Sequence, residues 1–189
     1  MRSSIGWGAA LALVLLVAAG PVAATTVLKM DLDDLADRAD LIFRATVLAV
    51  EPGTVAVGGG ELPTVTYRLR VDEAFKGELD AAGKDAPVVE ITVVGSLKDS
   101  PYHQGDSARF SALPRAPRLE RGGEYLLFTT APSAIGLSTT VGLGQGAFKI
   151  FLSADRQEMA VNELGNLGLF DGPVTYTDLA DAIRAEVGG

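Results

Sequence analysis

The chain has no cysteine among its 189 residues, and only one histidine and one tryptophan. The absence of cysteine excludes disulfides, thiolate metal ligands, a cysteine nucleophile and a lipid anchor on cysteine. A serine–histidine–aspartate triad would have to use His103, which no Gly-x-Ser-x-Gly elbow accompanies. A zinc site at His103 would lack other nitrogen or sulfur ligands, so we interpret it as a surface residue of a polar loop. We therefore predict no catalytic residue, no metal site and no cofactor.

Basic residues are outnumbered by acidic ones. The chain has 16 Lys and Arg against 24 Asp and Glu, a formal net charge of −8 at pH 7. Loss of the N-terminal segment would remove Arg2 and leave 15 against 24, or −9. This charge repels a phosphate backbone and an anionic bilayer surface. We expect no nucleic-acid partner.

Long hydrophobic runs are confined to the N-terminus. Arg2 precedes an apolar run over Ile5–Ala19, Gly20-Pro21 interrupts it, and small residues follow up to Ala24. This order is typical of a secretory signal. The alternative is an uncleaved anchor, but the run of about 15 residues is shorter than the roughly 20 that a spanning helix needs. We predict a signal peptide at 1–24 with cleavage after Ala24, a secreted or periplasmic location, and no membrane span after cleavage.

The remaining residues, 25–189, are predicted to form one mainly β domain with a short helix before the strands and another after them. Asp31 is a candidate N-cap for the first helix, which ends near Asp40. Thr175 and Asp178 form a capping box at the start of the terminal helix. Alternation of apolar and polar residues predicts the strands. They are 41–51, 64–75, 88–94 and 124–129, followed by a C-terminal hairpin of 141–152 and 158–161.

The segments between the strands contain turn residues. Pro52-Gly53 is predicted to end the first strand, and Gly58–Gly60 to form a flexible tip. Residues 96–122 are predicted to be a loop with a short strand near 108–110. Strands of this number suggest a closed or nearly closed barrel, and a two-sheet sandwich is the alternative.

Four segments carry a resemblance to a known family. They read Ala-Asp-Leu-Ile-Phe-Arg-Ala-Thr-Val at 39–47, Ala-Phe-Lys-Gly-Glu at 74–78, Val-Glu-Ile-Thr-Val at 89–93 and Arg-Gly-Gly-Glu-Tyr-Leu-Leu-Phe at 121–128. In this order they resemble the netrin-like domain, the OB-type barrel shared with tissue inhibitors of metalloproteinases. They resemble more closely a set of exported bacterial proteins in which Gly-Gln-Gly-Ala-Phe, here 144–148, follows.

The resemblance covers roughly residues 28–152 and implies a five- to six-stranded OB-like (netrin-like) barrel. The metalloproteinase inhibitors place an N-terminal cysteine on the zinc of their target, and this chain has no cysteine. Thr25, as the new N-terminus, would bring only an amino group and a hydroxyl. Arg68 and Arg70 share the polar face of strand 64–75, a face that binds ligands in OB-type barrels, although they are equally suited to pair with nearby acids. Thr25, Arg68 and Arg70 are thus the candidate partner-binding face.

Three other patterns have simpler explanations than a binding site. The acidic cluster between Asp31 and Asp40 has helical spacing and no glycine turn, so we interpret it as a solvated helix N-terminus and not a calcium loop. Gly142–Gly146 leads into strand-like residues, which favours turn glycines over a phosphate loop. Three glutamates on or beside strands could serve a glycosidase only if two of them converged on one cleft. They are Glu73, Glu90 and Glu124.

These patterns favour an exported, non-enzymatic interaction module that binds another exported protein. By fold analogy alone, that partner could be a secreted protease. The alternative is a carboxylate-based hydrolase or a carbohydrate-binding protein, which loses support because Trp7 lies in the predicted signal. A structural part of an envelope assembly is a third hypothesis, which predicts an exposed sheet edge or apolar patch.

Overall fold

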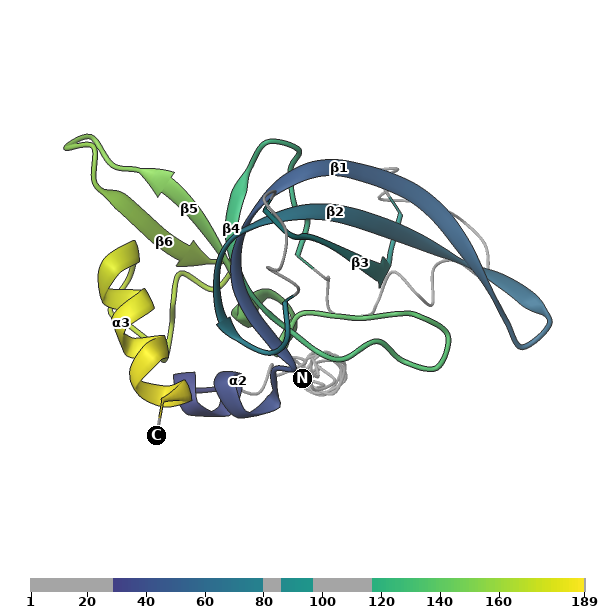
Figure 1. The fold of residues 1–189 in the computed structure, drawn as a ribbon, viewed down its shortest axis with the longest axis horizontal. Helices are drawn as coiled ribbons and strands as arrows, with labels where there is room; N and C mark the ends of the chain where they lie inside the picture. Colours follow the sequence, from purple (N-terminus) through teal and green to yellow (C-terminus); the bar gives the residue numbers. More distant parts are fainter. Residues whose placement is uncertain (1–28, 80–85, 97–116, 189) are drawn as a thin grey trace, which may run out of the picture.

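The computed structural model describes residues 29–79, 86–96 and 117–188. The predicted signal peptide, Thr25, His103 and the short strand predicted near 108–110 lie outside these residues. The described chain is mainly β, with one helix before the sheet and one after it, as predicted (Figure 1). Within it, no helix combines the length and the apolar character needed to cross a membrane.

The secondary structure comprises seven strands and three short helical segments over the described residues. The strands are β1 (Leu41–Val57), β2 (Gly60–Lys76), β3 (Val88–Val94), β4 (Glu124–Thr129), β5 (Ala147–Leu152), β6 (Glu158–Asn162) and β7 (Val174–Thr175). The helices are α2 (Leu32–Arg38), the 3-10 turn η2 (Leu143–Gly146) and α3 (Tyr176–Val187).

All seven strands belong to one antiparallel sheet with the order β3-β2-β1-β4-β5-β6-β7. Strands β1 to β4 form a Greek key, because β4 returns to the free side of β1 after the β1-β2-β3 meander. We predicted five or six strands, whereas the sheet of the described residues has seven. The sheet of the described residues is also open, because β5 pairs with β6 and not with β3. Ser138 N nevertheless donates to Thr92 O of β3 at 2.8 Å, so the loop after β4 reaches that edge.

Strands β1 and β2 form a hairpin that extends well beyond the rest of the sheet (Figure 1). The prediction that Pro52-Gly53 ends the first strand is wrong. Beyond Thr46, β1 no longer pairs with β4, so Pro52 lies on an edge where its missing N–H breaks no ladder. Gly58 and Gly59 form the turn with φ of +59° and +84°, as a two-residue hairpin turn of type I′ requires.

The two faces of the sheet bury two separate cores. Successive residues of a strand point to opposite faces, so Ile42 and Leu126 belong to one core while Phe43 and Leu127 belong to the other. The first core packs beneath α2 and α3. Its fully buried members include Leu35, Phe128, Phe148, Leu179 and Ile183. The second core lies on the other face of β1–β5. Its members include Val47, Tyr67, Leu69, Ile91 and Tyr125.

Both helices begin with the caps that the sequence predicts. The Asp31 carboxylate accepts from Asp34 N at 2.8 Å, and Thr175 Oγ1 accepts from Asp178 N at 3.1 Å. The Thr175 hydroxyl in turn donates to the Asp178 carboxylate at 2.7 Å. These bonds satisfy helix N–H groups that have no partner within the helix. Helix α2 ends at Arg38, slightly before the predicted position.

The glycine-rich segment before β5 is a turn, as predicted, although the strand itself begins at Ala147 and not at Val141. A Cβ on Gly146 would lie 2.4 Å from Val141 O, which explains why this close approach needs glycine. Buried Gln145 connects the turn to the segment just before α2, because its side-chain oxygen accepts from Met30 N at 3.0 Å. The side chain of Asn162 donates to Gln145 O at 3.1 Å.

Candidate functional site

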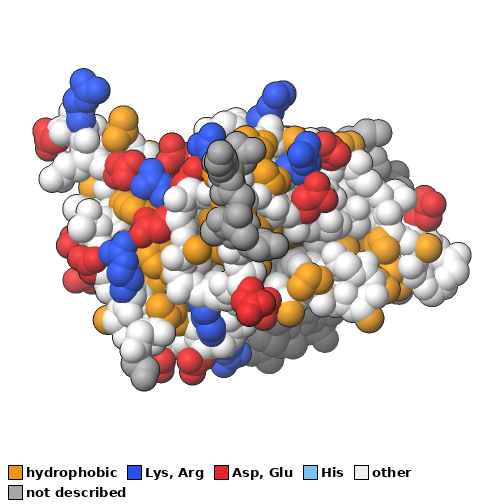
Figure 2. Space-filling model, in the orientation of Figure 1, with side chains coloured by type: hydrophobic (Ala, Val, Ile, Leu, Met, Phe, Trp, Pro, Cys, Tyr) orange, Lys and Arg blue, Asp and Glu red, His pale blue; other side chains and the backbone are white. Residues whose placement is uncertain are grey.

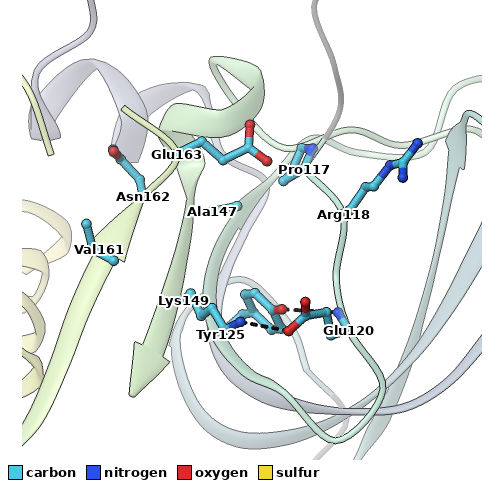
Figure 3. Close-up of a pocket in the computed structure, with 9 residues that line it drawn as sticks. All are labelled: Pro117, Arg118, Glu120, Tyr125, Ala147, Lys149, Val161, Asn162 and Glu163. Carbon is cyan, nitrogen blue, oxygen red and sulfur yellow. Dashed lines mark hydrogen bonds and ion pairs between the residues drawn. The ribbon is translucent and has the colours of Figure 1, made fainter. Parts of the chain in front are cut away.

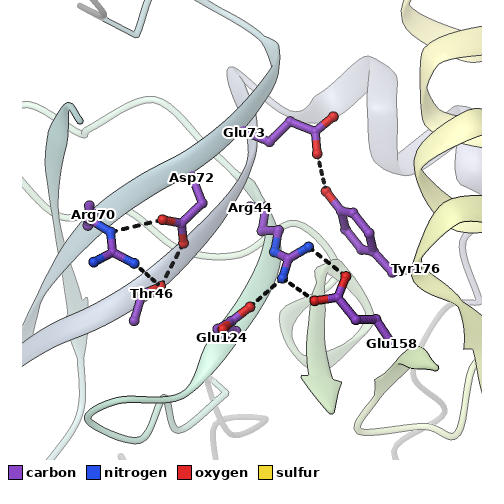
Figure 4. A network of polar contacts seen from close by, with 8 residues as sticks. All are labelled: Arg44, Thr46, Arg70, Asp72, Glu73, Glu124, Glu158 and Tyr176. Carbon is purple, nitrogen blue, oxygen red and sulfur yellow. Dashed lines mark hydrogen bonds and ion pairs between the residues drawn. The ribbon is translucent and has the colours of Figure 1, made fainter. Parts of the chain in front are cut away.

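A network of polar side chains lies on the helix-covered side of the sheet and is centred on Arg44 of β1 (Figure 4). The Arg44 side chain is only 16% exposed. Its guanidinium donates to Glu124 of β4 at 2.5 Å and to both oxygens of Glu158 of β6 at 2.7 and 2.9 Å. Arg44 thus joins the ends of three strands by charge-assisted hydrogen bonds.

Helix α3 contributes Tyr176 and Arg184 to this network. The Arg44 guanidinium lies over the Tyr176 ring, 4.4 Å from its centroid. The Tyr176 hydroxyl donates to Glu73 of β2 at 2.5 Å. Arg184, two turns further along α3, donates to the other oxygen of Glu73. The first residue of α3 is therefore held to both β1 and β2.

Irregular pairing between β1 and β2 brings consecutive acids to this face. Side chains normally alternate between faces, but the register shifts between the Arg44–Glu73 and Ala45–Val71 pairs. As a result, the side chains of Asp72 and Glu73 both lie on the side of the sheet that carries the Arg44 network. Asp72 accepts from Thr46 Oγ1 at 2.6 Å and from Arg70 Nε at 2.9 Å.

These contacts fix the protonation states of the network. Hydrogen bonds from Arg44 lower the pKa of Glu158 below its ordinary value. The same bond to Glu158, opposed by burial, raises the pKa of Arg44. Burial, followed by the hydrogen bond to Glu73, raises the pKa of Tyr176. At neutral pH Glu158 is therefore an ionised carboxylate, Arg44 a guanidinium and Tyr176 a neutral phenol, and their contacts order the junction of sheet and helix.

Arg68 and Arg70, the predicted partner-binding residues, lie on β2 with side chains 47% exposed. Arg68 Nε lies 3.3 Å from a Glu90 oxygen of β3, and Arg70 pairs with Asp72. Both arginines therefore adopt the pairing with nearby acids that the sequence left open. Their exposure leaves them available to solvent. Figure 2 shows basic and acidic side chains intermixed over much of the face that it displays.

Of the three glutamates considered from the sequence, two belong to the Arg44 network. Glu124 binds Arg44 directly, and Glu73 reaches it through Tyr176, whereas Glu90 pairs with Arg68. Sequence reasoning missed Arg44, Glu158 and Tyr176 as members of one cluster. Their positions are far apart in the chain, and only the strand order brings them together.

A half-open pocket lies on the opposite side of β4 and β5, with a volume of about 220 Å³ (Figure 3). Lys149 donates to Glu120 across it at 2.7 Å, and Tyr125 Oη accepts from Glu120 N at 3.1 Å. The Lys149 hydrogen bond lowers the pKa of Glu120. This carboxylate is therefore a poor proton donor at neutral pH.

Metal-ligating side chains do not cluster in residues 29–79, 86–96 and 117–188, where no group of three or more His, Cys, Asp or Glu could hold an ion. The acids of α2 act as expected from the sequence. Asp31 caps the helix, Asp33 and Asp34 lie in its first turn, and Arg38 pairs with Asp34 at 3.4 Å.

The outer hairpin, defined as residues 48–66, is a second candidate site. Its first strand pairs only with β2 over Leu48–Val57, because β4 pairs with β1 from Leu41 to Thr46. Within the described chain, the opposite edge of Leu48–Val57 therefore has no neighbouring strand. Backbone N–H and C=O groups on such an edge are ready to pair with another strand.

No protein-family model matches the chain, and no curated protein is significantly similar to it in sequence.

Proposed function

We propose that this chain is an exported, non-enzymatic module that binds another exported protein through its outer hairpin. The observation that carries the proposal is the one-sided pairing of β1 over Leu48–Val57 in the described chain. Natural proteins usually shorten, cover or charge such edges, because an open one recruits other strands. A long projecting strand with an unpaired side is therefore best explained as a binding element.

The rest of the fold supports a binding role by making the base of the hairpin rigid. The Arg44 network ties β1, β2, β4 and β6 to α3, and the two cores bury both faces of the inner strands. A rigid base keeps the projecting strand in place and lowers the entropy lost on binding. The exposed Arg68 and Arg70 lie at the inner end of the outer hairpin and would extend the contact surface.

The topology supports a place among OB-type, netrin-like folds. An OB-type barrel is a partly open, five-stranded Greek key. The order β3-β2-β1-β4-β5 provides five such strands, with β6, β7 and α3 as additions at the β5 side. By analogy with the netrin-like metalloproteinase inhibitors, the partner would be a secreted protease, and the missing cysteine means that inhibition would not use a thiolate on zinc.

Export is the first part of the proposal to test. Mass spectrometry of the protein recovered from the periplasm and from the culture fluid should give an N-terminus at Thr25. Recovery only from the membrane, with residues 1–24 retained, would contradict export as a cleaved protein.

Partner binding is tested by affinity capture with residues 25–189 as bait and the envelope and culture-fluid proteins of the source cell as prey. The matched control is a bait in which 54–63 are replaced by Asn-Gly, which closes the hairpin on the Gly53–Thr64 pair and keeps Val65 in the core. A second variant, Arg68→Glu/Arg70→Glu, tests the neighbouring face. We expect one enriched protein that the shortened bait loses. No enrichment, or glycan hydrolysis by the purified chain, would contradict the proposed function.

A further inference from the structure

The chemistry of the outer hairpin indicates what kind of partner it binds, and this inference rests on the proposed function. The pair that closes the Gly58-Gly59 turn is Val57–Gly60. In a two-residue hairpin this closing pair exchanges both hydrogen bonds, and bonded and non-bonded pairs then alternate along the strands. The backbone groups of Val50, Pro52, Thr54 and Ala56 are therefore directed away from β2.

An independent contact agrees with this register. Alternation from the turn directs the backbone groups of Thr66 toward β1, which makes its pair with Thr92 of β3 a non-bonded one. In such a pair the groups of Thr92 point outward. Thr92 O indeed accepts from Ser138 N outside the strand, and the two threonine hydroxyls meet at 2.9 Å, as expected for the closer, non-bonded pair.

Pro52 limits the length of chain that can pair with the open edge. It has no N–H, so a partner carbonyl opposite it would receive no hydrogen bond. Thr54 and Ala56 each present both a donor and an acceptor between Pro52 and the turn. The edge therefore favours a short strand that lies beside Thr54 and Ala56 and ends at Pro52.

Charge distinguishes a foreign partner from a second copy of this chain. Residues 48–66 contain Glu51 and Glu61 and no Lys or Arg. In Figure 2 the end of the molecule that holds the hairpin tip of Figure 1 shows acidic and hydrophobic side chains and no basic ones. A second copy would bring two more acids to the same place, whereas a basic segment would be attracted.

We propose that the outer edge of β1 accepts an extended, Lys- or Arg-bearing segment of a partner protein as an additional strand. The segment forms main-chain hydrogen bonds with Thr54 and Ala56, ends at Pro52, and places basic side chains near Glu51 and Glu61. Main-chain bonds provide the affinity in this mode of recognition, and the flanking side chains provide the specificity.

The probe is the synthetic peptide acetyl-Lys-Thr-Val-Lys-Val-Lys-amide, added to the chain 25–189. Amide hydrogen exchange is followed by NMR, and affinity by the accompanying shift changes. We expect slower exchange at Thr54 and Ala56 when the peptide binds, with no change at Val55, whose N–H already faces β2. Addition of salt should weaken binding, and Glu51→Gln/Glu61→Gln should weaken it at low salt.

Removal of the outward donors is the decisive change. Thr54→Pro/Ala56→Pro abolishes both N–H groups without touching the pairs made by Gly53 and Val55, and we expect about a tenfold weaker peptide affinity. The matched control, Thr54→Val/Ala56→Thr, keeps both donors and should bind as the original chain does. Should the proline variant fail to fold, a peptide N-methylated at alternate residues makes the same test on the unchanged protein.

The outcomes separate the two proposals. Equal affinity of the N-methylated and plain peptides, or peptide contacts away from Thr54 and Ala56, would overturn edge pairing. Exchange protection of Thr54 and Ala56 that depends on protein concentration without peptide would mean that a second copy occupies the edge, which also overturns it. If the capture experiment yields a partner that the proline variant retains, the binding function stands and this mode of recognition fails.

Discussion

The Arg44 guanidinium of β1 lies over the Tyr176 ring of α3, with Arg44 Cζ 4.4 Å from the ring centroid. This contact orients both groups for their other partners: Arg44 for Glu124 and Glu158, and Tyr176 for Glu73. The attachment of α3 to the sheet therefore combines apolar burial with a polar cluster whose members depend on one another.

Replacement of Arg44 should be costly. Arg44→Ala leaves Glu124 and Glu158 beside each other without a cation, in a site where the arginine side chain is mostly buried. We expect a loss of about 2 kcal/mol in the free energy of unfolding, measured by urea denaturation. Arg38→Ala is the control, because its pair with Asp34 is exposed, and it should lose less than about 0.5 kcal/mol. Similar losses in both variants would contradict a central role for Arg44.

Tyr176 should make the protein sensitive to alkali. Its pKa is raised in the folded state, mainly by burial, so folding favours the neutral phenol. This stabilisation is complete below the ordinary pKa of 10.0 and is lost as the pH rises above it. The free energy of unfolding should therefore fall less steeply between pH 9 and pH 11 in Tyr176→Phe than in the original chain. Parallel curves would show that Tyr176 is not the group responsible.

Glu158 should make the stability of the protein sensitive to acid, whereas Tyr176 makes it sensitive to alkali. The pKa of Glu158 is lowered by the hydrogen bonds from Arg44, so its contribution is present above the ordinary value of 4.5 and is lost as the pH falls through the lower, folded value. We expect Glu158→Gln to be less stable than the original chain at pH 7 and to lose less stability on transfer to pH 3. Equal losses of stability in the two proteins on this transfer would show that Glu158 is not the group responsible. The measurement is urea denaturation at both pH values.

Gly146 should tolerate no side chain. A Cβ there would lie 2.4 Å from Val141 O, so Gly146→Ala must shift the turn before β5 and its contact with Met30. We expect a loss of about 2 kcal/mol or more in the free energy of unfolding. Gly136→Ala is the comparison, since Gly136 has a φ of +77° but open space around it, and it should lose only about 1 kcal/mol. Equal losses would show that a Cβ at Gly146 costs no more than the left-handed backbone at Gly136, and would contradict severe crowding at Gly146.

The sequence predicts the local elements well where the signal is local. The alternation over Val88–Val94 and the apolar run Glu124–Thr129 have the predicted bounds, and the caps at Asp31 and Thr175 form as expected. These features depend on the period of a strand or on a side chain reaching a nearby N–H. Neither requires knowledge of the neighbouring elements.

The features that the sequence did not predict depend on pairing between distant segments. Pro52 resembles a strand terminator until one knows that, among the residues the structure describes, β1 pairs only with β2 at that point. Glu158 shares a face of β6 with Ala160, so the alternation predicts its face but not Arg44 as its partner. The register shift that places Asp72 beside Glu73 on the polar side is marked in the sequence only by Glu73, which stands where the alternation of β2 predicts an apolar residue.

The two cores have a consequence for how the protein unfolds. Ile42 and Phe43 are adjacent in β1 but belong to different cores. The same holds for Leu126 and Leu127 in β4. Separation of β1 or β4 from the sheet would expose residues of both cores, because each strand contributes side chains to both. We therefore expect the inner strands to melt in a single cooperative transition, with the calorimetric enthalpy equal to the van't Hoff enthalpy. The tip of the outer hairpin, residues 54–63, contributes no residue to either core and can open without disturbing that transition.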